Sequence, residues 1–234
     1  MEKIKLFCFH HLGGNASFYY KWKNFLPNNI ELFPIDLAGR GMNKKDFYRN
    51  FKELINDVGE QLKKEITGPY ILFGHSMGAL IVYELIYYLK QQKLLPPLHC
   101  FFSGRNTPDL KSDIFYENFD KEKFILNLRK IGGIPAIFEL YPELLEEFIP
   151  IIKADYNVMK SYEFITHKDK IDSDISILIG KEDNTILYEE LAKWRCITRK
   201  NCDLYFISGN HFYLFDDKNI SKIINILTSK IQEN

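Results

Sequence analysis

The sequence has few cysteines, no excess charge of either sign and no long apolar run. The four cysteines are widely spread, and the closest pair, Cys196 and Cys202, has a C-x5-C spacing that fits neither a zinc knuckle nor a thioredoxin-like motif. Thirty-one basic residues balance thirty-one acidic ones, so no broad field points to nucleic acid or to an anionic membrane surface. We therefore expect reduced thiols, no metal site, no nucleic-acid partner and a cytoplasmic location.

The first apolar run, residues 6–9, stops at His10, far short of a signal-peptide core or of the about 20 residues that span a membrane. We expect no membrane association. What the chain does have is 46% hydrophobic and 15% aromatic residues in a length of 234, which is enough for a full core without disulfides or a structural metal. We expect a single domain over residues 1–234, and a monomer.

Short apolar runs alternate with helical patterns along most of the chain. The predicted strands span residues 4–10, 30–36, 70–73, 98–103, 175–179 and 204–207, and the predicted helices span residues 16–26, 51–66, 79–92, 187–198 and 219–231. The strand-like runs are nearly unbroken in apolar character, as in strands that are covered on both faces. The alternation predicts an α/β fold with a mostly parallel central sheet flanked by helices.

Residues 106–172 break this alternation. They contain no good strand, and their apolar residues recur at helical spacing over 124–131 and 144–152, with Gly132, Gly133 and Pro135 in between. We predict a helical insertion that serves as a lid. The alternative is an ordinary helical subdomain with no mobile role.

The sharpest motif is G-H-S-M-G at residues 74–78, which follows an apolar run and precedes a helical pattern. A sharp strand-to-helix turn needs glycine on both sides of a strained serine, because a Cβ there would clash with the adjoining backbone. We predict that Ser76 is a nucleophile at the positive end of a helix dipole. The alternative is a serine that only caps the helix. The side chain of His75 is predicted to point away from the hydroxyl and to serve packing.

A serine nucleophile needs a histidine base, and the histidine needs a carboxylate that fixes its tautomer. In this type of fold the chain order is Ser, acid, His. His99 lies inside a strand-like run and His167 lies in a lysine-rich stretch, whereas His211 lies in a loop after the last predicted strand. His211 is therefore the predicted base.

The predicted acid lies just after residues 175–179, because catalytic groups gather at the carboxyl ends of parallel strands. Asp183 is our choice there, and Glu182 is the near competitor. Asp216 and Asp217 follow His211, which breaks the expected order, so we interpret them as residues at a helix start or in solvent.

An oxyanion hole requires two backbone N–H groups, one from the residue after the nucleophile and one from a loop after an early strand. Met77 supplies the first. The loop at residues 10–14, H-H-L-G-G, brings its main chain close to a ligand through its two glycines, and this makes the Leu12 amide the predicted second donor. His10 and His11 have no partners at metal-ligand spacing.

The chain resembles the type II thioesterases, freestanding editing hydrolases of polyketide and nonribosomal peptide synthesis, over nearly its whole length. The matching segments are residues 9–14 (FHHLGG), 17–19 (SFY) with Trp22, 36–41 (DLAGRG), 73–79 (FGHSMGA), 103–105 (SGR), 128–135 (LRKIGGIP), 143–145 (ELL) and 154–156 (ADY). His10 and Ala38 stand where the family has proline, and Leu12 stands where it has alanine.

The resemblance implies an α/β-hydrolase that removes acyl or aminoacyl groups from the phosphopantetheine arm of acyl or peptidyl carrier domains. It places Ser76, Asp183 and His211 in the family's triad positions and implies no cofactor beyond the carrier's arm. Three alternatives stay open from the residues: a small-molecule carboxylesterase, an acyltransferase, and a catalytically silent scaffold that binds a ligand or a synthetase subunit.

Overall fold

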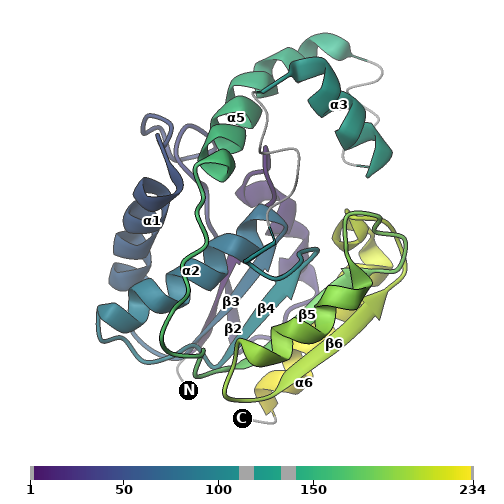
Figure 1. The fold of residues 1–234 in the computed structure, drawn as a ribbon. Helices are drawn as coiled ribbons and strands as arrows, with labels where there is room; N and C mark the ends of the chain where they lie inside the picture. The colour runs from purple at the N-terminus through teal and green to yellow at the C-terminus, as the bar shows by residue number, and fades with distance from the viewer. Residues whose placement is uncertain (1–2, 111–118, 133–140, 233–234) are drawn as a thin grey trace.

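A computed structural model of the chain describes residues 3–110, 119–132 and 141–232, and a six-stranded sheet forms its centre (Figure 1). The strands are β1 (Ile4–Phe9), β2 (Ile30–Pro34), β3 (Tyr70–His75), β4 (His99–Ser103), β5 (Asp174–Gly180) and β6 (Cys202–Ile207). Their spatial order is β2-β1-β3-β4-β5-β6, and every neighbouring pair is parallel. The predicted parallel sheet is confirmed, and each strand lies within about two residues of its predicted bounds.

Helices cover both faces of the sheet. The helices α1 (Phe51–Glu65) and α2 (Met77–Gln91) pack on one face, and α6 (Asp217–Gln232) and the 3-10 helix η1 (Ala16–Asn24) pack on the other. In β1, Phe7 and Phe9 join the first core and Leu6 and Cys8 join the second, because successive side chains of a strand point to opposite faces. This double covering explains why the strands are apolar throughout.

Two predicted helices wind more tightly than an α-helix. The segments η1 and η3 (Tyr188–Cys196) are 3-10 helices, in which side chains three residues apart align. In η1 the buried pair Tyr19 and Trp22 has this spacing, with ring centroids 5.1 Å apart. In η3 the buried pair Leu191 and Trp194 has it too. The three-residue spacing of the anchoring side chains is the physical reason for the difference.

The last helix begins slightly earlier than predicted. It starts at Asp217 rather than at residue 219, and the Asp216 carboxylate accepts a hydrogen bond from the Lys218 amide at 2.8 Å. This agrees with the interpretation of Asp216 and Asp217 as residues at a helix start. The short 3-10 helix η4 (Tyr213–Phe215) precedes them.

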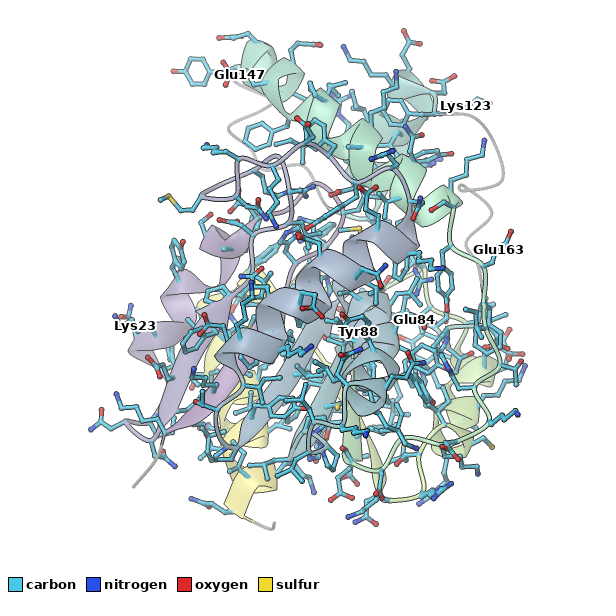
Figure 2. All side chains as sticks on the ribbon, turned by 90° about the vertical axis from the view of Figure 1, so that its left-hand side faces the viewer. Lys23, Glu84, Tyr88, Lys123, Glu147 and Glu163 are labelled. Carbon is cyan, nitrogen blue, oxygen red and sulfur yellow. The ribbon has the colours of Figure 1, made fainter. Side chains whose placement is uncertain are left out.

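Between β4 and β5 the chain forms the helices α3 (Lys121–Lys130) and α5 (Pro142–Lys160), which lie beyond one end of the sheet (Figure 1). Figure 2 shows Lys123 of α3 and Glu147 of α5 at the end of the molecule away from Glu84 and Tyr88 of α2. The predicted break at Gly133 and Pro135 lies outside the described residues. No helix of the described residues is long and apolar enough to cross a membrane.

Candidate active site

The turn between β3 and α2 holds Ser76 in a strained backbone conformation, with φ 56° and ψ −110°, values that a non-glycine residue rarely adopts. A Cβ on Gly74 would lie 2.1 Å from the Gly78 carbonyl oxygen, and a Cβ on Gly78 would lie 2.1 Å from the Phe9 carbonyl oxygen. The Ser76 amide donates to the Ser103 carbonyl at 2.8 Å. Close backbone packing therefore requires both glycines and fixes the direction of the serine.

The loops after β5 and β6 bring Asp183 and His211 into contact. The Oδ2 atom of Asp183 lies 2.7 Å from Nδ1 of His211, and the two side chains are 0% and 7% exposed. The competing acid, Glu182, turns away and accepts a hydrogen bond from the Gly209 amide. Of the two carboxylates that the sequence left open, Asp183 is the one that reaches the imidazole.

Thr185 completes the surroundings of the Asp183 carboxylate. Its hydroxyl and its amide donate to Oδ1 of Asp183 at 2.6 and 3.0 Å. Burial alone would raise the pKa of Asp183, but the hydrogen bonds from His211 and Thr185 and the attraction of His211 outweigh it and hold the pKa below its ordinary value. A carboxylate that stays ionised keeps the proton of the imidazole on Nδ1 and leaves Nε2 as the basic atom.

Ser76 and His211 line one cavity of about 910 Å³, which lies between the carboxyl end of the sheet and α3. Met77 and Leu12 line the same cavity, whereas Asp183 lies behind His211. Apolar side chains of α3 and of the following turn form its far wall: Phe124, Leu128 and Ile131. The charged residues among the described lining are Arg105 and Lys130. A large, mostly apolar cavity with a few convergent polar groups is typical of a small-molecule site.

The predicted oxyanion donors both lie at this cavity. The loop after β1 turns sharply, with the Gly14 amide donating to the His11 carbonyl at 3.0 Å, and Leu12 lies at its tip. Within the described part of the chain, the Leu12 amide donates no hydrogen bond to another residue. Met77 is the first residue of α2, so its amide belongs to the helix N-terminus, where free N–H groups favour a negative charge.

The other histidines are packed or bonded elsewhere. Burial and the nearby charge of Arg40 lower the pKa of His10 to about 3, although its Nδ1 atom lies 2.8 Å from the His11 carbonyl oxygen. The ring of His11 packs against Phe18 and Phe212 at 4.8 and 5.0 Å between centroids, and burial lowers its pKa as well. Within the described residues, neither ring belongs to a group of three or more His, Cys, Asp or Glu side chains that could hold a metal ion.

Two further histidines pair with polar side chains. His99 Nε2 lies 2.8 Å from Ser176 Oγ, and His167 Nε2 lies 3.1 Å from Oε2 of Glu84. Neither is among the described residues that line the cavity. Of the three downstream histidines that the sequence offered, the structure brings His211 to the serine's cavity.

His75 is fully buried, as its predicted packing role requires, but it also has a polar partner that the sequence did not suggest. Its Nδ1 atom lies 2.9 Å from Ser103 Oγ, and its ring centroid lies 5.0 Å from that of His211. Thr185 was missed as well. An Asp followed two residues later by a threonine is the pattern of an Asx-type turn, and that signal could have identified it.

The model of the thioesterase domain family matches residues 4–231. The chain belongs to this family. The six-stranded parallel sheet with helices on both faces is therefore the α/β-hydrolase fold of a thioesterase. The protein is a hydrolase that acts on thioesters.

The relatives of this thioesterase cover nearly all of it. "Gramicidin S biosynthesis protein GrsT" of Aneurinibacillus migulanus is 34% identical over 220 residues, which is 92% of this chain and 85% of GrsT. The human "S-acyl fatty acid synthase thioesterase, medium chain" is 29% identical over 96% of this chain and 86% of its own length. The crystal structure of ClbQ from the colibactin NRPS/PKS pathway superposes with a TM-score of 0.91 at 30% identity, covering 99% of this chain and 98% of ClbQ. The predicted resemblance to the thioesterases of polyketide and nonribosomal peptide synthesis is confirmed, because the thioesterase family model matches nearly the whole chain and its relatives include GrsT of gramicidin S biosynthesis and ClbQ of an NRPS/PKS pathway.

Proposed function

We propose that this thioesterase removes acyl or aminoacyl groups from the phosphopantetheine arms of acyl or peptidyl carrier domains, and so clears mis-loaded carriers of a polyketide or nonribosomal peptide synthetase. The observation that carries the proposal is the shared cavity, in which Ser76 lies with a histidine whose Nδ1 atom is held by Asp183. Its volume of about 910 Å³ suits an acyl chain together with the end of a carrier's arm. The full-length similarity to GrsT and ClbQ supports the choice of carrier-bound substrates.

The residues act in two half-reactions. His211 Nε2 takes the proton of Ser76, and Oγ forms a bond to the thioester carbonyl carbon. The amides of Leu12 and Met77 hold the oxyanion until the C–S bond breaks and the thiol leaves with the proton from His211. Water, deprotonated by the same histidine, then attacks the carbonyl carbon of the acyl-serine ester. The C–Oγ bond breaks, His211 returns the proton to Oγ, and the free acid leaves. The cycle needs no cofactor apart from the carrier's arm.

The test uses carrier proteins loaded with a panel of acyl groups, and it follows their intact mass before and after the enzyme is added. Ser76→Ala should lower the unloading rate by about 10⁶, as loss of a serine nucleophile does. A matched control is Ser229→Ala, which changes an exposed serine on α6. Unloading by Ser76→Ala at the wild-type rate would overturn the proposal.

The same panel separates the related reactions. Faster turnover of simple esters than of carrier thioesters would indicate a carboxylesterase. Appearance of new esters or amides when alcohols or amines are added would indicate acyl transfer. Failure of Ser76 to react with a serine-directed phosphonate would indicate a silent scaffold.

A further inference from the structure

A buried ion pair joins α5 to the loop between β2 and α1. Nη1 and Nη2 of Arg40 donate to Oδ2 and Oδ1 of Asp155 at 2.6 and 2.5 Å, and the two side chains are 2% and 3% exposed. This is the two-pronged geometry in which a guanidinium and a carboxylate bind most strongly. The partners are 115 residues apart in the chain, so the pair fastens the segment above the site to the body of the domain.

Both partners of this pair also hold the loop after β1. The Gly13 amide donates to Oδ2 of Asp155 at 2.8 Å, and Nη1 of Arg40 donates to the Gly14 carbonyl at 3.1 Å. Asp36 holds the chain just after this loop, since Oδ1 of Asp36 accepts a hydrogen bond from the amide of Ala16, the first residue of η1, at 2.8 Å. Gly13, Gly14 and Ala16 are therefore each hydrogen-bonded to one of these three side chains, whereas Leu12 lines the cavity and its amide donates to no other residue in the described part of the chain.

The side chain one turn before Asp155 packs against the same loop. Gly13 has φ +75°, and a Cβ placed on it would lie 2.9 Å from Cγ1 of Ile152. Ile152 is 5% exposed. Helix α5 therefore meets the loop with one apolar and one charged side chain, and both contacts converge on Gly13.

Stability alone is a weak reason for such a pair. Desolvating two charges costs free energy that their attraction only partly returns, and apolar side chains of similar volume often replace a buried ion pair without loss. What apolar side chains cannot do is accept the hydrogen bond of the Gly13 amide or donate to the Gly14 carbonyl.

We propose that the Arg40–Asp155 pair is a positioning device for the oxyanion hole, which holds the Leu12 amide in place through the backbone of Gly13 and Gly14. This rests on the proposed function, in which Leu12 donates to the oxyanion. The amides of Leu12 and Gly13 belong to adjacent peptide units, so the direction of one constrains the other. Helix α5 is then part of the catalytic apparatus as well as a cover over the cavity.

The experiment compares Asp155→Asn with Glu84→Gln. Glu84 is a matched control, because it is also a buried carboxylate (Figure 2). It lies on α2 and binds Tyr162 at 2.9 Å and His167 at 3.1 Å, two residues of the segment that follows α5. It is not among the described residues that line the cavity. Both substitutions should lower the unfolding midpoint, because each disturbs a buried polar network.

The kinetic readouts should separate the two variants. Removing an oxyanion donor typically costs about 10²–10³ in turnover, and a misdirected donor loses part of that. We expect Asp155→Asn to lower kcat by about 10–10² fold with little change in KM. An alkyl trifluoromethyl ketone forms an oxyanion on Ser76, and the affinity of the variant for this inhibitor should fall by a similar factor. Glu84→Gln should leave kcat and ketone affinity within about twofold of wild type.

Wild-type kcat and ketone affinity in a destabilised Asp155→Asn protein would overturn the proposal, because the pair would then be only structural. If single variants do not fold, Arg40→Met/Asp155→Leu replaces the pair with apolar groups and should restore folding while keeping the loss of kcat; a folded double variant with wild-type kcat would equally overturn it. The ketone also distinguishes a failure of this proposal from a failure of the proposed function. A wild-type enzyme that binds the ketone but unloads no carrier would contradict the proposed carrier-bound substrate. Equal ketone affinity in wild type and Asp155→Asn would contradict the positioning role.

Discussion

The floor of the cavity and its roof are held in different ways. The floor, which is Ser76, His211 and the residues bonded to them, is fixed by directional contacts such as the 2.7 Å hydrogen bond between Asp183 and His211. The roof is α3, whose buried side chain Phe124 meets Tyr156 of α5 with ring centroids 5.9 Å apart. Directional hydrogen bonds in a buried site tolerate little displacement, whereas a few apolar contacts tolerate more. Substitutions in the floor should therefore change the rate of the chemistry, and substitutions in the roof should change which acyl group binds.

After the loss expected from Ser76→Ala, the next largest effect is also in the floor. Asp183→Asn keeps the shape of the side chain but removes the charge that holds the proton on Nδ1 of His211, and the same change in a serine protease triad lowers kcat by about 10⁴. We expect a loss of that order in steady-state thioester hydrolysis, with KM nearly unchanged. The control is Glu182→Gln, since glutamine still accepts the hydrogen bond of the Gly209 amide. Equal losses in the two variants would mean that the loop as a whole, and not the Asp183 charge, matters.

The floor could be predicted from the sequence because each of its parts has a recognisable local sequence pattern. The glycines around Ser76 stand where an added Cβ would lie 2.1 Å from a backbone oxygen, and the acid and the base each follow an apolar run at a strand end. The parallel sheet then brings these strand ends together. The choice of Asp183 over Glu182 was closer, and only the hydrogen bond to His211 distinguishes the two carboxylates.

The ion pair that fastens α5 to the body of the domain could not be predicted in this way. Arg40 and Asp155 lie in loops and helices that share no periodic pattern, and their separation of 115 residues leaves a single sequence without a signal for their contact. The tight winding of η1 and η3 was also missed, because a helical pattern does not distinguish a spacing of three from one of 3.6 over nine residues.

The second prediction concerns pH and the buried histidines that surround the floor. The pKa values of His10, His11 and His75 are lowered in the folded protein, chiefly by burial. Below the ordinary pKa of about 6.5, the unfolded chain binds protons that the folded chain does not bind, so the free energy of unfolding falls as the pH falls. For His10 this continues down to a pKa of about 3.

Each such histidine contributes a slope of up to about 1.4 kcal/mol per pH unit. Urea unfolding at a series of pH values should show a steep loss of stability between about pH 6.5 and 5. His11→Phe keeps the aromatic packing against Phe18 and Phe212. It should lower the slope of the free energy of unfolding against pH by the contribution of one histidine. Helix α3 contains no histidine, so the roof should add nothing to this pH dependence. A free energy of unfolding that stays constant from pH 7 to 5 would show that the buried histidines do not make the floor more sensitive to pH than the roof.

The third prediction concerns the roof. Leu128 lines the cavity, and truncating it removes apolar contact with a bound chain in both the ground state and the transition state. Leu128→Ala should raise KM by about tenfold for acyl groups long enough to reach α3, with kcat preserved and acetyl hydrolysis unaffected. Leu126→Ala on the same helix is the control, because Leu126 is 51% exposed. A fall in kcat that is the same for short and long acyl groups would mean that the roof also positions the chemistry.

The smallest effect is expected from the ion pair between Lys121 of α3 and Glu146 of α5, which links the two helices of the roof region at the surface. Its side chains are 41% and 61% exposed, and exposed pairs contribute less than about 1 kcal/mol because water and salt screen them. Lys121→Ala should therefore leave the urea midpoint and the kinetic constants nearly unchanged, whereas breaking the buried pair with Asp155→Asn should cost about 3–5 kcal/mol. Both pairs attach α5 to another part of the molecule, and they differ mainly in burial. If Lys121→Ala destabilised the protein as strongly as Asp155→Asn, the exposed pair would hold α3 as firmly as the buried pair holds α5, and the acyl preference would have to be set by the shape of a rigid cavity.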